Sequence, residues 1–174
     1  MKPENHTTAI SREQITIRKA LPDDVVRIAE LLIESAEIQG APEALCVDAA
    51  ALLREGFGEP RRFRALVAES AGDIVGVAVY CFTFSTWTSI NGMYLEDLYV
   101  EAAWRRCGIA RALVLALANI AVEHKCRRFQ WLVLRSNQAA IAFYESLGAT
   151  ATDEWMPMQM DGKTIERVTR RTLD

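Results

Sequence analysis

The chain has 174 residues, of which 51% are hydrophobic and 25% charged, and its formal net charge is −3. This length suits one domain with a full-sized core, and the composition is that of an ordinary globular protein. The slightly acidic balance offers no broad basic face, and no apolar run reaches membrane-spanning length, so neither a nucleic-acid nor a membrane partner is expected.

The cysteines and histidines argue against a metal centre and against a disulfide framework. There are 4 cysteines and 2 histidines, and the cysteines are too widely spaced for a zinc site or a paired set of disulfides. Residues 1–12 also lack the apolar stretch of a signal peptide. We therefore expect no metal cofactor and a cytoplasmic location.

The N-terminal third predicts one strand and two helices. Residues 1–12 are polar and are predicted to be a flexible extension, with the domain spanning 13–174. Alternation of apolar residues predicts a strand at 15–17, and the apolar spacing after Pro22 predicts a helix as far as Gln39. A second helix is predicted at 43–54, before two glycines.

The centre of the chain is predicted to be rich in β-structure. Residues 64–69 and 74–84 have the composition of a hairpin around the tight turn at 71–73. A polar loop is expected at 85–92, followed by a strand at 93–100.

The C-terminal part alternates helices and strands. An amphipathic pattern predicts a helix at 108–124, followed by an apolar strand at 129–134 and a helix at 137–147. Residues 150–170 are predicted to form two strands joined by the turn Asp161-Gly162-Lys163. The complete order, β-α-α-β-β-β-α-β-α-β-β, predicts a mixed α/β (α+β) domain.

One strand-loop-helix segment predicts an anion site. The strand that ends at Val100 leads into a turn with Gly108, after which a helix begins. The first amides of a helix lack intrahelical partners, and the helix dipole makes that end positive. Arg105, Arg106 and Arg111 add charge around it. The segment lacks the Gly-Lys-Ser/Thr ending of nucleotide hydrolases and the three glycines of dinucleotide-binding proteins, so another phosphate ligand is expected.

Two motifs resemble the signatures of the GNAT superfamily of N-acetyltransferases. Arg105-x-x-Gly108-x-Ala110 is similar to its Gln/Arg-x-x-Gly-x-Gly/Ala motif, and residues 137–149 are similar to its Asn-x-x-Ala/Ser-x-x-Phe-Tyr signature. The resemblance covers residues 14–170 and implies a GNAT-like fold, with a mixed, mostly antiparallel, twisted sheet of about six or seven strands flanked by about four helices.

Other segments resemble the diamine (spermidine/spermine) N-acetyltransferase branch. They are Glu55–Gly58, Leu66–Glu69, Ile74–Ala78, Trp87 and Tyr94–Asp97. This resemblance implies a homodimer that transfers an acetyl group directly from acetyl-CoA to a primary amine of a small molecule. The residues it implies for acetyl-CoA binding are Leu98, Tyr99, Val100, Arg105, Arg106, Cys107, Gly108, Ile109, Ala110, Arg111, Asn137, Ala140 and Tyr144.

The resemblance also implies catalytic and acceptor-binding roles. Tyr144 would protonate the departing thiolate, Glu96 would accept the proton of the amine through a water molecule, and Asp97 would attract the cationic acceptor. Because adjacent strand residues face opposite ways, we expect at most one of this carboxylate pair to face the cleft. Trp87 would line the acceptor site or a dimer interface, and Glu154 would reach the acceptor or remain solvated.

The chain departs from the diamine branch where a polycation would bind. Ile38-Gln39 replaces an aromatic-acid pair, and Arg135 stands where the branch has a glutamate. At about 4 Å in a partly screened site, like charges cost several kcal/mol. Arg135 therefore favours an acceptor with a carboxylate, such as a lysine-like amino acid.

The competing hypothesis for the function is a non-catalytic acyl-CoA-binding sensor or dimerising module. For the chemistry, an acyl-enzyme route through Cys107 is less favoured than direct transfer.

Overall fold

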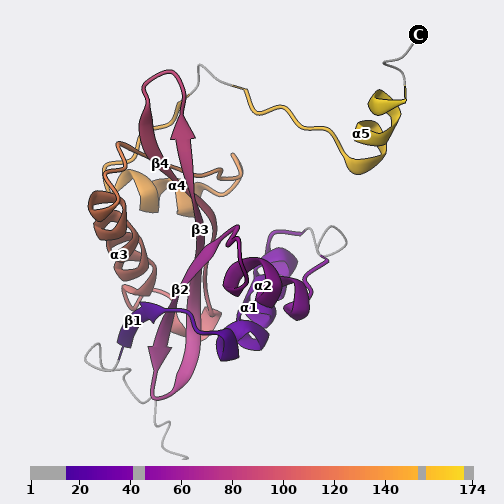
Figure 1. Ribbon diagram of the computed structural model, residues 1–174. Coiled ribbons are helices and arrows are strands. Elements are labelled where there is room, and N and C mark those ends of the chain that lie inside the picture. Colours follow the sequence, from indigo (N-terminus) through magenta and orange to yellow (C-terminus); the bar gives the residue numbers. More distant parts are fainter. Residues whose placement is uncertain (1–14, 41–45, 153–155, 171–174) are drawn as a thin grey trace, which may run out of the picture. The chain divides into compact units, whose positions relative to one another are not determined.

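A computed structural model of the chain describes residues 15–40, 46–152 and 156–170 (Figure 1). The chain divides into two compact units, residues 1–132 and 133–174. No helix within the described ranges is long and apolar enough to cross a membrane. The predicted flexible extension at 1–12 lies outside these ranges.

The first unit is built on a mixed sheet of five strands in the order β1-β2-β3-β4-β5. The first four strands pair antiparallel and β5 is parallel to β4. Its elements are β1 (Ile15–Lys19), the 3-10 turn η2 (Pro22–Asp24), α1 (Val25–Ile38), α2 (Ala49–Phe57), β2 (Arg64–Ser70), β3 (Asp73–Ser85), β4 (Ile90–Val100), the 3-10 turn η4 (Ala102–Trp104), α3 (Ile109–Glu123) and β5 (Arg128–Gln130).

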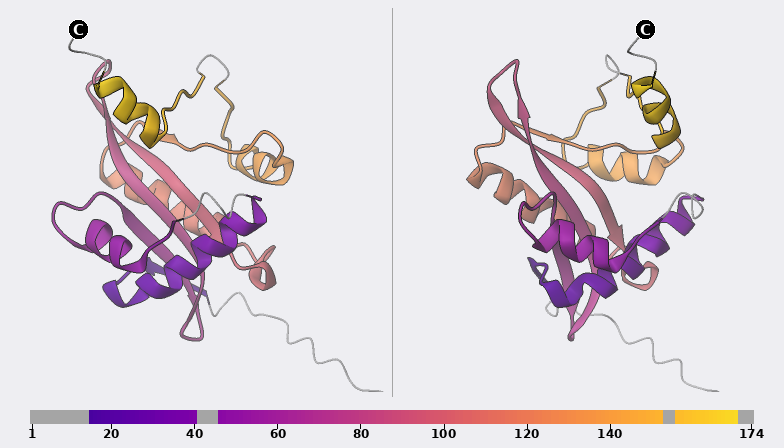
Figure 2. Two further views of the ribbon diagram at one scale, coloured as in Figure 1. Left: turned by 90° about the vertical axis from the view of Figure 1, so that its right-hand side faces the viewer. Right: turned by 45° about the vertical axis from the view of Figure 1, so that its right-hand side comes forward.

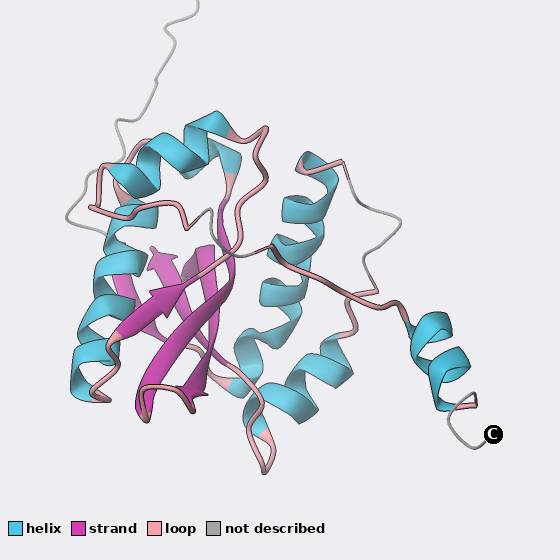
Figure 3. Cartoon of the chain, turned by 90° about the horizontal axis from the view of Figure 1, so that it is seen from above, coloured by secondary structure: helices cyan, strands magenta, loops and turns pink. Residues whose placement is uncertain are grey.

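Helices cover both faces of this sheet, which gives the first unit two apolar layers. Figures 1 and 2 show α1 and α2 against one face and α3 against the other, and the strands twist when seen from above in Figure 3. Alternate residues of β2 supply the two layers: Ala65 and Val67 pack under α1, and Leu66 and Ala68 under α3. The predicted α/β fold class is confirmed.

An ion pair ties the start of α1 to the sheet. The guanidinium of Arg18, on β1, donates to both carboxylate oxygens of Asp24, with Nη1–Oδ2 at 2.6 Å and Nη2–Oδ1 at 3.0 Å. The Leu21 amide donates to the same carboxylate at 2.6 Å. These hydrogen bonds, chiefly the one from Arg18, lower the pKa of the buried Asp24 carboxyl.

The second unit contains α4 (Gln138–Glu145) and α5 (Gly162–Thr169) in its described part. Asn137 caps α4, because its Oδ1 accepts from the amide of Ala140 at 3.1 Å. The other predicted helices are present with bounds that differ at their ends. The predicted start of the second helix, 43–45, lies outside the described residues, and α2 begins after the cap Asp48.

The predicted C-terminal hairpin is wrong. The predicted turn at Asp161-Gly162-Lys163 begins α5 instead, because the Asp161 carboxylate accepts from the amide of Thr164 at 2.7 Å and caps the helix. The residues from 150 to 170 that the structure describes contain no strand. An isolated hairpin is marginal without a third strand or a helix to pack on, so a turn sequence alone does not establish two strands.

The strand predicted at 129–134 is also shorter than expected. Only Arg128–Gln130 pairs with β4, and Leu132 and Leu134 are exposed. It still counts as one strand, so the absent hairpin alone leaves five strands in the described chain instead of about six or seven.

Candidate active site

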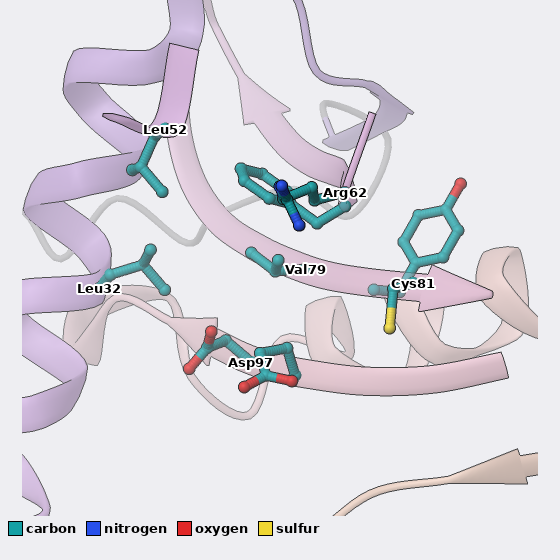
Figure 4. A pocket seen from close by; sticks show the side chains of 9 residues that line it. Leu32, Leu52, Arg62, Val79, Cys81 and Asp97 are labelled. Atoms are coloured by element: carbon teal, nitrogen blue, oxygen red, sulfur yellow. The ribbon is translucent and has the colours of Figure 1, made fainter. Parts of the chain in front are cut away.

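A pocket of about 270 Å³ opens in the first unit, beside the sheet face that α1 and α2 cover. Leu32 on α1, Leu52 on α2 and Val79 on β3 supply apolar wall, and Asp97 on β4 supplies a carboxylate (Figure 4). This volume is slightly below the range of about 300–1,000 Å³ that is typical of ligand pockets. The lining residues are Leu32, Leu52, Arg62, Phe63, Val79, Tyr80, Cys81, Glu96 and Asp97.

A β-bulge in β4 lies beside this pocket. Val79 of β3 is opposite Asp97, but its neighbour Tyr80 is opposite Leu95, which leaves Glu96 as an extra residue in β4. Bulges bend a strand and redirect its side chains, and they are frequent next to active sites.

The bulge changes which residues of β4 face the pocket. Leu95 packs in the layer under α3, whereas Tyr99 packs in the layer under α1. In a regular strand these two residues would share a face. The extra residue shifts the alternation, so both Glu96 and Asp97 line the pocket. The expectation that at most one of them would face the cleft is therefore wrong.

The two carboxylates give the pocket a negative side. Burial, and then the charge of Glu96, raise the pKa of the Asp97 carboxyl above its ordinary value. Glu96 itself is exposed. Neither carboxylate forms an ion pair with any residue in 15–40, 46–152 or 156–170. The pocket can therefore offer both charges to a cationic ligand.

The outer edge of β4 is open beyond the bulge. Its pairing with β5 runs only from Gly92 to Tyr94. Residues Leu98, Tyr99 and Val100 pair with β3 alone among the described strands. Alternate backbone groups of this stretch therefore face away from β3 without a partner among the described strands.

The loop after β4 has the backbone of an anion cradle. Gly108 precedes α3 with φ of 84°, and Arg106 has φ of 62°. Within the described chain, none of the amides from Arg106 to Arg111 donates to a protein acceptor. A Cβ added at Gly108 would meet nothing within 4 Å, so the space above its backbone is open. Free amides at a helix start with a positive dipole suit a phosphate group.

The arginines of this loop have different roles. Arg105 braces it, because its Nε donates to the carbonyl oxygen of Val100 at 3.0 Å and its guanidinium lies 5.4 Å from the centre of the Tyr99 ring. Arg106 and Arg111 are exposed and can supply charge to an anion. The thiol of Cys107 donates to the carbonyl oxygen of Arg105 at 3.6 Å.

The remaining predicted residues lie in the second unit or on a loop. In α4, Tyr144 contacts Phe143 with ring centres 5.1 Å apart, and burial raises the pKa of its hydroxyl. Arg135 is exposed, and its carbonyl accepts from the side chain of Gln138 at 2.7 Å. Trp87, in the loop between β3 and β4, is 84% exposed. Glu154 lies outside the described residues.

Sequence reasoning missed the wall opposite the carboxylates. Arg62 and Phe63 precede β2 and line the pocket, yet no periodic pattern marks them. Phe63 reaches its position by packing over Gly56 of α2, where an added Cβ would lie 2.6 Å from the ring. The pair of arginines at 61 and 62, next to a predicted strand, was the one local sign of a functional role.

Among the described residues, no group of three or more His, Cys, Asp or Glu side chains could hold a metal ion.

Comparisons with known proteins agree with this geometry. Residues 27–149 match the model of the acetyltransferase (GNAT) family. The chain is 32% identical over 165 residues to a thialysine N-epsilon-acetyltransferase of Sus scrofa, covering 88% of this chain and 96% of the relative. It is 37% identical over 146 residues to a human spermidine/spermine N(1)-acetyltransferase-like protein, covering 80% of this chain and 21% of that longer protein.

A solved structure also shares the fold. An integron cassette protein from the mobile metagenome of V. cholerae superimposes with a TM-score of 0.77 at 23% identity, covering 90% of this chain and 98% of the other. The family match and the relatives together show the activity class as well as the fold. The chain belongs to the acetyltransferase (GNAT) family and is an N-acetyltransferase.

Proposed function

We propose that the protein transfers the acetyl group of acetyl-CoA directly to a primary amine of a small molecule, either a diamine or a lysine-like amino acid. The observation that carries this proposal is the pair of carboxylates, Glu96 and Asp97, that the bulge of β4 turns into one pocket. Two negative charges without an ion-pair partner among the described residues, in a small and partly apolar pocket, attract an ammonium group on a short methylene chain.

The carboxylates also provide a way to remove the proton from the acceptor amine. A primary amine with the pKa of a lysine side chain, about 10.4, is almost fully protonated at neutral pH, and its deprotonation costs about 4 to 5 kcal/mol. In this proposal Asp97 attracts the ammonium group, and the exposed Glu96 accepts its proton through a water molecule. Such positioned acid-base groups typically contribute about 10² to 10⁴ in rate.

The loop and the edge of β4 would hold acetyl-CoA. The amides from Arg106 to Arg111, which have no acceptor within the described parts of the chain, fit its diphosphate, and the open space at Gly108 allows a phosphate to approach the backbone. The free edge at 98–100 can hydrogen-bond the pantetheine arm and the acetyl carbonyl, and can stabilise negative charge that develops on the carbonyl oxygen.

Tyr144 would complete the transfer. A thiolate leaves the thioester and must be protonated, and the Tyr144 hydroxyl, whose pKa is raised by burial, carries the proton to donate. Asn137 and Ala140, at the start of α4, are proposed to contact the coenzyme arm; their mutual hydrogen bond fixes the helix start.

The names of the relatives support both acceptor classes. One acetylates thialysine and another is similar to spermidine/spermine acetyltransferases. Arg135 favours the amino acid, because a second ammonium group would meet a like charge there. A homodimer and a cytoplasmic location belong to the same proposal; all four cysteines are free thiols, as in a reducing compartment.

Two measurements test the proposal. Acetyl-CoA should raise the melting temperature of the purified protein, and thiol release should be detected with lysine, thialysine or a diamine but not without an amine. Binding without thiol release on any amine would support the non-catalytic alternative. Absence of acetyl-CoA binding would refute the assignment of the loop.

A further inference from the structure

The acceptor pocket has a positive side as well as a negative one. Arg62 lines it together with Glu96 and Asp97, and Leu32, Leu52 and Phe63 supply apolar wall. Figure 4 shows Arg62 and Asp97 among the labelled side chains around the cavity. A pocket for a simple polyamine would not need a guanidinium group, so its presence calls for a chemical reason.

Arg62 is held in place by Glu55 at the end of α2. Its Nε lies 2.6 Å from Oε2 of Glu55, and its backbone amide donates to the Glu55 carbonyl at 2.8 Å. Oε1 of the same carboxylate accepts from Nε of Arg54 at 2.8 Å. Two guanidinium groups therefore share one carboxylate, and the cluster keeps one net positive charge.

The guanidinium of Arg62 retains donors for a ligand. Its Nε is used by Glu55, and no partner of either Nη group is found in the described part of the chain. The Nη groups of arginine form a planar pair that matches a carboxylate. Phe63, which follows Arg62, packs its ring over Gly56 of α2.

We propose that Arg62 determines acceptor specificity by binding a carboxylate of the substrate, so that the pocket selects a zwitterionic amino acid over a diamine. This inference rests on the proposed function. In it, Glu96 and Asp97 face the amine that is acetylated, the apolar wall contacts the methylene chain, and Arg62 faces the carboxylate at the other end. A diamine would instead bring its second ammonium group towards Arg62.

A pair of acceptors separates these cases. Lysine and cadaverine share the amine and the methylene chain, and differ by the carboxylate of lysine. Replacing Arg62 with glutamine should lower kcat/KM for lysine about 10- to 150-fold, mainly through KM, because one charge-assisted interaction is lost. The value for cadaverine should stay the same or rise. Arg62→Lys should recover part of the lysine activity, because it keeps the charge but not the planar pair of donors.

Arg61 provides the matched control. It is the preceding arginine, it is not among the pocket-lining residues, and its guanidinium lies 6.0 Å from the centre of the Phe57 ring. Arg61→Gln should leave both kcat/KM values unchanged. Arg135→Gln, measured with the same two acceptors, tests the competing explanation of carboxylate preference.

The possible results are distinct. An equal loss on lysine and cadaverine in Arg62→Gln, or no loss on either, overturns the role of Arg62. A lysine-specific loss in Arg135→Gln alone also overturns it. Wild-type protein that acetylates cadaverine but not lysine refutes this inference and leaves the proposed function intact. Wild-type protein that binds acetyl-CoA but acetylates no amine refutes the proposed function itself.

Discussion

Replacing Gly108 with alanine separates the two tasks of the loop before α3, which are to turn the chain and to bind a phosphate. Gly108 has φ of +84°, a conformation that costs a residue with a side chain about 1–2 kcal/mol. The new methyl group would meet no protein atom within 4 Å, so no steric clash adds to this cost. For a chain of this size we expect the melting temperature to fall by about 2–8 °C.

The effect on the coenzyme should be larger than the effect on stability. A shift of the Gly108 amide away from a charged phosphate would forfeit one charge-assisted hydrogen bond, about 1.5–3 kcal/mol. The dissociation constant for CoA should then rise about 10- to 150-fold. The assay is isothermal titration with CoA, with thermal denaturation of the same samples.

Gly72 is the matched control. It has φ of +92° in the turn between β2 and β3, and an added Cβ there also meets nothing within 4 Å. Gly72→Ala should therefore lower the melting temperature by a similar amount and leave CoA binding unchanged. If Gly108→Ala binds CoA as tightly as Gly72→Ala does, the loop before α3 does not hold the phosphates of CoA.

Further substitutions test the carboxylates and the proposed acid. The raised pKa of Asp97 means that the folded protein holds this proton more tightly than the unfolded chain, so its stabilising effect is present in acid and lost as pH rises through the folded pKa. Asp97→Asn should therefore increase the free energy of unfolding at pH 7, in urea titrations, with no gain below the ordinary carboxyl pKa. Asp24 has the opposite sign: its lowered pKa makes its ion pair with Arg18 stabilising above the unfolded pKa, and Asp24→Asn should cost about 2 kcal/mol at pH 7, a difference that shrinks as pH falls through the folded pKa. Glu96→Gln should lower kcat about 10²- to 10⁴-fold with CoA binding unchanged, and an unaltered kcat would exclude it as the base. Tyr144→Phe should also lower kcat within that range, and a change confined to KM for acetyl-CoA would exclude proton donation.

Local signals were sufficient to predict the loop and the start of α4. The turn at Gly108 and the helix start at Asn137 depend on residues within a few positions of each other. Their geometry follows from backbone preferences and from single side-chain hydrogen bonds. The same kind of local inference failed at Asp161, where one Asp-Gly sequence is compatible with a hairpin turn and with a helix cap. Which of the two forms depends on whether a partner strand exists, and local sequence does not contain that information.

The pocket could not be predicted in the same way, because its shape depends on pairing between strands. Val79, Tyr80, Leu95 and Asp97 show that one extra residue is accommodated in β4. Nothing in the run Tyr94-Leu95-Glu96-Asp97 marks where that extra residue falls. Arg62 faces the pocket because of its ion pair with Glu55, which lies in the preceding helix.

The bulge links the shape of the sheet to the chemistry proposed for it. A regular β4 would turn Glu96 and Asp97 to opposite faces, and Asp97 would then lie in the apolar layer under α3. With the extra residue, both charges lie at the pocket, where partial burial and then repulsion by the charge of Glu96 raise the pKa of Asp97. A bound ammonium group would relieve that repulsion and lower this pKa again, because an opposite charge favours the ionised form. The bulge brings two like charges together, and a cation that binds between them relieves their repulsion. That relief contributes favourably to the free energy of cation binding.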